Sequence, residues 1–255
     1  MVSKTTIETY DLLCNHLDKN KKVYYSRFGD GDIFIMDGRQ ESYHTWSDKL
    51  QEELIESITI DNENYIIGVA VNYPKENGMY TGVFEPFRYN KELENFLIKK
   101  FNFDKNKSFE SALTFHYLSV FNPDKVINFL NKYIRPKKKM FVGSIEKESI
   151  EKLIGNIDYY VRIPDRNAYY TIDEWYPNIL ENIDNCEVLI PAAGMATRVI
   201  NKRLWKLDKN IHSIDLGSIV DAAVNKPTRT WIRKEGDKIK KLLIKWYTHT
   251  YHMLH

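Results

Sequence analysis

The second half of the chain alternates short β-branched runs with longer amphipathic segments. The runs predict four strands: "KMFVGS", "IDYYVRIP", "CEVLIPAAG" and "IHSIDLG". The segments between them have the apolar spacing of helices: "EKESIEKLIGN", "TIDEWYPNILENI" and "MATRVINKRLWKL". Because successive parallel strands are joined by right-handed crossovers, this βαβαβαβ order predicts an α/β fold. We expect a doubly wound, mostly parallel, Rossmann-like sheet flanked by helices.

The first half adds two strands to this expectation. One strand, Val23–Ser26, runs into a Gly-Asp-Gly-Asp turn, and "NYIIGVAV" predicts a buried strand. The expected helices are Thr5–Lys19, "SDKLQEELIESI" with Ser47 as its N-cap, Arg88–Lys100, Ser108–Val120 and "NPDKVINFLNKYI". The long irregular segment Tyr73–Phe87 is rich in aromatic residues, as functional loops often are.

Length and composition suit one large domain with a short tail. The chain has 255 residues, of which 43% are hydrophobic. We expect residues 1–235 to form a single domain and residues 236–255 to form an amphipathic C-terminal helix. That helix is expected to dock on the body of the protein. The alternative is contact with a partner domain or weak contact with a membrane surface.

The charge and the cysteines exclude several classes of protein. Lys and Arg number 37 against 35 Asp and Glu, so a basic nucleic-acid-binding protein is not expected. Two cysteines, Cys14 and Cys186, form neither a disulfide framework nor a metal-binding pattern. The N-terminal segment has no apolar core of a signal peptide, and no apolar run is long enough for a transmembrane segment. A cytoplasmic location is expected.

Polar, glycine-containing sequences follow four of the predicted strands. They are "SRFGDGD", "RIPDRNAYY", "IPAAGMATR" and "SIDLGSIVDA". In a parallel sheet the carboxyl ends of the strands lie at one edge, and ligands bind there. These four strand ends therefore predict the functional site.

The segment "SRFGDGD" has two interpretations. In an extended turn, side chains two residues apart point to the same side, so Asp30 and Asp32 would converge on Mg²⁺ or Mn²⁺. The glycines would let a diphosphate approach the backbone, and Arg27 would pair with phosphate. The same letters also fit an ordinary turn with exposed aspartates. The pattern alone leaves both open.

The segment "VLIPAAGMATRVI" predicts a cradle for phosphate or nucleotide. Its small residues around Gly194 would admit a ligand to a helix N-terminus, with Thr197 as a donor and Arg198 as a cation. Tight packing of strand against helix explains the small residues equally well.

Three further polar positions carry alternatives. Asp215, after the next strand, is placed to meet a ribose hydroxyl or to cap a helix. Asn167 and Asp165 fit either a ligand site or helix capping. His44 and His116 stand alone in the sequence, and an ordinary packed role is expected for His116.

Taken together, these segments resemble the GT-D-fold glycosyltransferases, formerly DUF1792. "SRFGDGD" resembles the family signature R-[FY]-G-D-G-E, and "VRIPDRNAYYTIDEWYPNIL" resembles its strand–Pro–x–x–Asn–Ala–aromatic segment. "VLIPAAGMATRVINKRLWKLDKNIHSIDLGSIVD" resembles the block that closes with Asp-x-Gly. The order is kept over about Tyr24–Asp221. Two departures are Asp32 in place of Glu and Ala192-Ala193-Gly194 in place of Gly-Pro-Thr.

The resemblance implies a metal-dependent hexosyltransferase that moves a sugar from a UDP-sugar to a hydroxyl of a glycan or glycoprotein acceptor. It implies Mn²⁺ or Mg²⁺ at Asp30 and Asp32, with Arg27 stabilising the UDP leaving group. The positions implied to contact the nucleotide-sugar are Arg27, Asn167, Gly194, Thr197, Arg198 and Asp215.

Other assignments rest on location alone. Asp165, Glu85 and Asp221 are candidate general bases, and Tyr73–Phe87 is a candidate platform for the acceptor. An S-adenosylmethionine-dependent methyltransferase is the main alternative, because "VLIPAAGMA" is followed by the acid Asp215. A non-catalytic module that binds a nucleotide or a carbohydrate is the other.

Overall fold

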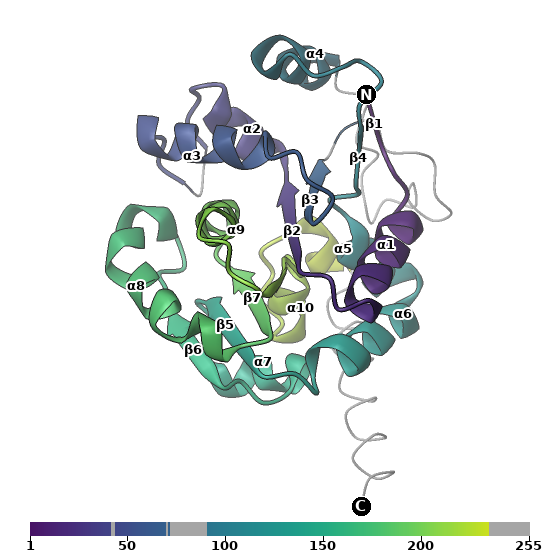
Figure 1. The fold of residues 1–255 in the computed structure, drawn as a ribbon, viewed down its shortest axis with the longest axis vertical. Helices are drawn as coiled ribbons and strands as arrows, with labels where there is room; N and C mark the ends of the chain where they lie inside the picture. Colours follow the sequence, from purple (N-terminus) through teal and green to yellow (C-terminus); the bar gives the residue numbers. More distant parts are fainter. Residues whose placement is uncertain (42–43, 70, 72–90, 235–255) are drawn as a thin grey trace, which may run out of the picture.

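A six-stranded parallel sheet forms the centre of the molecule (Figure 1). The computed structural model describes residues 1–41, 44–69, 71 and 91–234. The strand order is β3-β2-β8-β7-β5-β6, and every neighbouring pair is parallel. The strands are β2(Val23–Phe28), β3(Tyr65–Val69), β5(Lys139–Gly143), β6(Tyr159–Arg162), β7(Val188–Ala192) and β8(His212–Ile214). The predicted α/β fold class is therefore confirmed, with all six expected strands in one sheet.

Helices cover both faces of this sheet. Figure 1 shows α3, α8 and α9 on one side and α1, α5 and α6 on the other. The helices are α1(Thr6–Asp18), α2(Asp30–Met36), α3(Asp48–Ile58), α4(Lys91–Phe101), α5(Thr114–Phe121), α6(Pro123–Phe129), α7(Lys147–Ile154), α8(Ile172–Asn182), α9(Ala196–Lys206) and α10(Ile219–Ala223). Short turns complete them: η1(Leu130–Ile134), η2(Ala168–Thr171) and η3(Ile183–Asn185).

Alternating side chains of the strands divide the hydrophobic core into two clusters. Along β2, Tyr24 packs on the side of α3 and α9, whereas Val23 and Tyr25 pack on the side of α1 and α5. In β5, Met140 and Phe141 divide in the same way. Successive side chains of a strand point to opposite faces, and here both faces are apolar. Such strands suit only the interior of a three-layer sandwich.

Two expectations for the first half were wrong. The helix expected from Ser108 begins at Thr114, because β4(Ser108–Phe109) pairs with β1(Val2–Ser3) and Glu110 continues in extended form beside Gly68. The expected Gly-Asp-Gly-Asp turn is instead the start of a helix, because α2 begins at Asp30 with Gly29 as its N-cap. The helix expected over residues 88–100 is α4, and only its first three expected residues lie outside the described residues. The aromatic segment 73–87 and the expected tail helix 236–255 lie wholly outside them.

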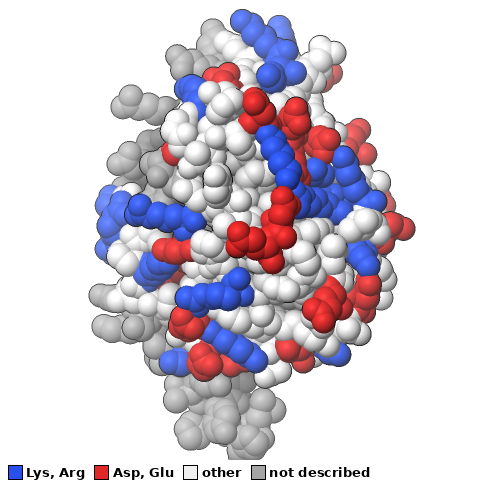
Figure 2. Space-filling model, turned by 90° about the vertical axis from the view of Figure 1, so that its left-hand side faces the viewer, with Lys and Arg blue, Asp and Glu red and all other residues white. Residues whose placement is uncertain are grey.

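The surface of the described residues mixes the two signs of charge. Figure 2 shows Lys and Arg side chains interspersed with Asp and Glu over the face turned to the viewer. Between α3 and α9, Lys202 lies 2.9 Å from Glu53 and 2.7 Å from Glu56. These ion pairs join the two helices that flank the site described below. None of the described helices is long and apolar enough to cross a membrane.

A buried asparagine ties α9 to the two central strands. Asn201 Nδ2 donates to Ser26 Oγ at 2.9 Å, and Asn201 Oδ1 accepts from Ser213 Oγ at 2.6 Å. Ser26 lies in β2 and Ser213 in β8, so one side chain holds both strands against the helix. Buried polar groups of this kind stabilise a fold only while they remain paired.

We expect Asn201→Ala to lower the free energy of unfolding by about 2–3 kcal/mol, because it leaves two buried hydroxyls without this partner. Urea denaturation measures the change. Asn178→Ala, at an exposed position of α8, is the matched control and should change stability by less than about 0.5 kcal/mol. Equal effects of the two substitutions would contradict the assigned role.

Candidate functional site

Three adjacent strands, β2, β8 and β7, bring polar side chains to the carboxyl edge of the sheet. Arg27 lies near the end of β2, and Asp215 follows β8 directly. The turn after β7 leads into α9, whose first turn carries Arg198. The prediction that these strand ends share one edge is confirmed. "RIPDRNAYY" follows β6, which is separated from β7 by β5.

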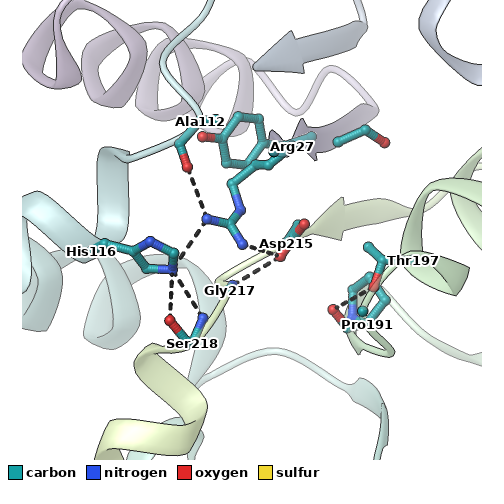
Figure 3. Close-up of polar contacts among 12 residues, drawn as sticks. Arg27, Ala112, His116, Pro191, Thr197, Asp215, Gly217 and Ser218 are labelled. Atoms are coloured by element: carbon teal, nitrogen blue, oxygen red, sulfur yellow. Dashed lines mark hydrogen bonds and ion pairs between the residues drawn. The ribbon is translucent and has the colours of Figure 1, made fainter. Parts of the chain in front are cut away.

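The Arg27 guanidinium is held by Ala112, His116 and Asp215 (Figure 3). Its Nη1 donates to the Ala112 carbonyl at 2.9 Å and to His116 Nε2 at 3.2 Å, and its Nη2 donates to Asp215 Oδ1 at 3.1 Å. Arg27 is buried. A guanidinium held in this way is fixed in position, and a contact of Arg27 with a phosphate stays a prediction.

Arg198 continues the chain of charges. Its Nη2 donates to Asp32 Oδ2 at 3.1 Å, and its Nη1 lies 3.5 Å from Asp215 Oδ2. Nη1 also donates to the Gly194 carbonyl at 2.6 Å. Guanidiniums and carboxylates thus alternate in the order Arg27, Asp215, Arg198, Asp32, and all four side chains are buried. Two positive and two negative groups leave the network electrically neutral.

Asp32 is the end of this network. Its Oδ2 also accepts the Gly29 N–H at 2.8 Å, whereas its Oδ1 is buried without a hydrogen-bond partner. Burial raises the pKa of the Asp32 carboxyl, although Arg198 and the Gly29 N–H act against this shift. A buried acceptor without a partner is costly unless a ligand satisfies it.

The expected convergence of Asp30 and Asp32 is wrong. The helix α2 begins at Asp30, so residues two apart lie on nearly opposite sides of its axis rather than on one side of an extended turn. Asp30 is exposed and accepts the Gly31 N–H at 2.9 Å, whereas Asp32 points into the protein. The structure separates the two carboxylates by environment.

A divalent ion fits this site only in part. Among the described residues, no three His, Cys, Asp or Glu side chains gather as a ligand set. Mg²⁺ and Mn²⁺ often take one or two carboxylates and complete their coordination with substrate phosphates and water. Asp32 Oδ1 suits that role because it is an acceptor without a partner.

His116 is a site residue that sequence reasoning missed. Its Nε2 accepts the Ser218 N–H at 2.9 Å. Because a backbone N–H only donates, the proton of this imidazole is on Nδ1 and the ring is neutral. Burial and the guanidiniums of Arg27 and Arg229 lower the pKa of His116 well below its usual range. The ring also stacks on Trp231, with centroids 5.4 Å apart.

Gly217 makes room for this arrangement. It has a φ of +63°, and a Cβ there would overlap Arg27 Nη2 and His116 Nε2. Its N–H donates to Asp215 Oδ1 at 2.9 Å. Both residues of the Asp-x-Gly pair therefore contribute to the network: Asp215 binds the two guanidiniums, and Gly217, which has no Cβ, leaves room for Arg27 and His116.

The turn after β7 uses its polar groups internally. Thr197 Oγ1 accepts the Ala193 N–H at 3.1 Å and lies 3.3 Å from the Pro191 carbonyl, which it donates to. Thr197 is buried, so it shapes the turn, and a direct contact with a nucleotide stays a prediction. Gly194 is exposed with a φ of +58°, and a Cβ there would lie 2.8 Å from His44 Nε2.

Asn167 binds the residue that follows His44. Its Oδ1 accepts the Thr45 N–H at 2.7 Å, and its own backbone is left-handed with a φ of 53°. His44, the second residue that sequence reasoning missed, thus lies between Asn167 and the N-terminus of α9. Neither histidine belongs to a motif with a fixed spacing, and only the fold brings them to this edge.

The proposed general bases have other partners. Asp165 forms an ion pair with Lys226 and accepts from Ser144 Oγ at 2.9 Å. Asp221 accepts from Thr228 Oγ1 at 2.7 Å. Glu85 lies outside the described residues. A catalytic role for any of them stays untested.

Comparison with protein families shows which family the chain belongs to. The family described as "Glycosyltransferase GT-D fold" matches residues 25–226. This range includes the whole network and the turns at Gly194 and Gly217. The chain belongs to this family. A search of curated proteins gave no match.

Solved structures agree with the GT-D assignment. A glycosyltransferase of the DUF1792 group from Streptococcus sanguinis superposes with a TM-score of 0.64 and 19% identity, over 86% of this chain and 82% of that one. A structure reported as showing that domain of unknown function 1792 has a distinct glycosyltransferase fold gives 0.58 and 20%, over 86% and 79%. A selenomethionine-substituted DUF1792 structure gives 0.57 and 21%, over the same shares. At these identities the likeness concerns the fold.

Membership of the GT-D family supports a glycosyltransferase and favours it over the methyltransferase alternative. One departure from the family pattern lies within the network and the other contacts it. Asp32 is the carboxylate with the unpartnered oxygen, and Gly194 supplies the carbonyl that Arg198 binds.

We expect Gly217→Ala to destabilise the protein by more than about 1 kcal/mol, because the residue has a positive φ and its Cβ would displace Arg27 or His116. Thermal and urea denaturation measure this. Gly29→Ala is the matched control, since Gly29 has a φ of −96° and a Cβ there would lie 3.8 Å from its nearest neighbour. A Gly217→Ala protein as stable as Gly29→Ala would refute the packing argument.

The lowered pKa of His116 predicts a pH dependence. An unfolded histidine takes up a proton near pH 6.5, whereas the folded one resists it, so stability falls as the pH drops below about 6.5. We expect His116→Gln, which keeps a neutral acceptor, to lose less stability than the wild type between pH 7 and about pH 5.5. Urea denaturation at both pH values measures the difference. His44 and His212, whose pKa values burial also lowers, remain in both proteins. Identical slopes would contradict the assignment.

Proposed function

We propose that this GT-D protein is a divalent-metal-dependent hexosyltransferase that uses a UDP-sugar donor and a hydroxyl of a glycan or glycosylated protein as acceptor. The observation that supports it is the neutral network of Arg27, Asp215, Arg198 and Asp32 at the carboxyl edge, in which Asp32 Oδ1 has neither a hydrogen bond nor an ion pair among the described residues. Ligands of doubly wound sheets bind at this edge.

The charge of the network favours a metal requirement. A nucleotide diphosphate brings negative charge, and the two guanidiniums are already balanced by Asp32 and Asp215. Additional positive charge is therefore needed at the site. Asp32 would hold Mn²⁺ or Mg²⁺ through Oδ1. When bound, the ion would neutralise charge that builds on the UDP leaving group.

The protein's own groups hold and orient the donor. Arg198 lies between Asp32 and Asp215 and contacts the turn before α9, so its guanidinium and the helix N-terminus present positive charge together. Asp215 and His116 fix Arg27 in a second position. Preorganised cations of this kind stabilise a leaving diphosphate without rearranging during the reaction.

Calorimetric titration with UDP tests the proposal. We expect UDP to bind in the presence of Mn²⁺ and not in its absence, and Asp32→Asn to weaken this binding by about tenfold or more. The substitution keeps an acceptor for the Gly29 N–H, and circular dichroism checks that the variant is folded. The matched control is Asp30→Asn at the exposed carboxylate of the same helix, which should weaken binding less.

Three results would overturn the proposal. UDP binding that does not depend on a metal would refute the proposed metal dependence. A larger effect of Asp30→Asn than of Asp32→Asn removes Asp32 as the principal ligand. Binding of S-adenosylmethionine in place of UDP would restore the methyltransferase alternative. Metal-dependent release of UDP from UDP-hexoses then separates an enzyme from a module that only binds.

A further inference from the structure

A cavity of about 250 Å³ lies next to the network. Its walls come from residues 44–50, where α3 begins, and from residues 167–173, which follow β6. The residues that the argument uses are His44, Trp46, Lys49, Asn167, Tyr170 and Asp173. The mechanism above assigns no role to this space.

His44 connects the cavity to the site. His44 lines the cavity and also lies against Gly194, which is in the turn before α9 and whose carbonyl Arg198 binds. Asn167 lines it as well and accepts the Thr45 N–H, which joins the two walls. A ligand in the cavity would therefore lie beside the group that binds the proposed diphosphate.

The walls combine aromatic rings with polar groups. Trp46, Tyr169 and Tyr170 supply the rings. Lys49 lies 3.0 Å from Asp173 and forms a charged pair at the same cavity, and the Asn167 amide adds hydrogen-bonding capacity. Rings with a few convergent polar groups are typical of sites for small polar ligands.

Tyr170 is an exposed aromatic residue on a turn that is held by hydrogen bonds. Its side chain is 82% exposed, which is unusual for an aromatic residue. The turn below it is fixed, because the Tyr170 N–H donates to the Asn167 carbonyl at 2.8 Å and Trp175 Nε1 donates to the Ala168 carbonyl at 3.0 Å. The neighbouring Tyr169 is buried and donates to Glu53 Oε1 at 3.1 Å. The ring of Tyr170 is thus presented at the cavity by ordered structure.

We propose that this cavity binds one pyranose ring, with Tyr170 and Trp46 against its apolar face and Asn167, Lys49 and Asp173 toward its hydroxyls. The volume is slightly below the range of about 300–1,000 Å³ usual for drug-sized ligands, and a single sugar ring is smaller than these. A sugar offers C–H groups on its faces and hydroxyls around its rim, which matches rings beside a charged pair. The ring belongs to the donor or to the acceptor, an assignment that rests on the proposed function.

Saturation-transfer NMR with free monosaccharides tests the site without any nucleotide. The probes are D-glucose, D-galactose and N-acetyl-D-glucosamine. We expect ring-proton signals from at least one of them with the wild type, and Tyr170→Ala to weaken that binding by about tenfold. Tyr170→Phe should keep it because it keeps the ring. Leu207→Ala, at another exposed apolar residue, is the matched control. Absence of signal from all three sugars, or unchanged binding in Tyr170→Ala, would overturn the proposal.

A second titration identifies the source of the ring. If it is the donor's, Tyr170→Ala weakens binding of the matching UDP-hexose with Mn²⁺ but not that of UDP. If the ring is the acceptor's, Tyr170→Ala binds UDP and UDP-hexose as tightly as the wild type does. The wild type then also binds the monosaccharide when it is saturated with UDP-hexose. Equal weakening of UDP and UDP-hexose, without monosaccharide binding, would show a nucleoside pocket and refute the pyranose site. Monosaccharide binding without UDP binding would leave this site standing while the proposed function fails.

Discussion

The alternation of charge from Arg27 through Asp215 and Arg198 to Asp32 is the interaction on which the site depends. Burying any one of these groups alone would be strongly unfavourable, since an unpaired charge loses its hydration. Each carboxylate instead lies beside a guanidinium, and Asp215 serves two. The four groups come from β2, the segment after β8, α9 and α2. The network therefore couples the geometry of the site to the assembly of the whole carboxyl edge.

The sheet makes that assembly possible. Its strands are apolar on both faces, so helices must cover both sides, and polar groups are left at the strand ends. α9 has the central position: Asn201 ties it to β2 and β8, and Lys202 pairs with α3. Its first turn then places Arg198 between two carboxylates. A helix anchored along its length can hold a side chain at its N-terminus precisely enough to position a ligand.

Much of the fold was predictable because its signals are local. Uninterrupted β-branched runs predicted the six strands, and their order with the intervening helices predicted a parallel sheet. The start of α2 was missed because Gly-Asp-Gly-Asp favours a turn. In the structure the Asp32 carboxylate accepts the N–H of Gly29, the N-cap residue, and a helix begins there. His116 was missed because its significance comes from Arg27 and Ser218, which are distant in the sequence. No periodicity or motif in the sequence indicates such a contact.

The change from an extended turn to a helix also alters the meaning of the acid pair. Two converging carboxylates would have formed a metal site largely by themselves. In the helix, one carboxylate remains in solvent and the other joins a neutral buried network, where its Oδ1 has no hydrogen-bond partner among the described residues. The described residues of such a site supply too few ligands and too little negative charge to hold an ion tightly alone. Because a diphosphate brings oxygens and negative charge, ion and nucleotide would bind most favourably together, each supplying what the other needs.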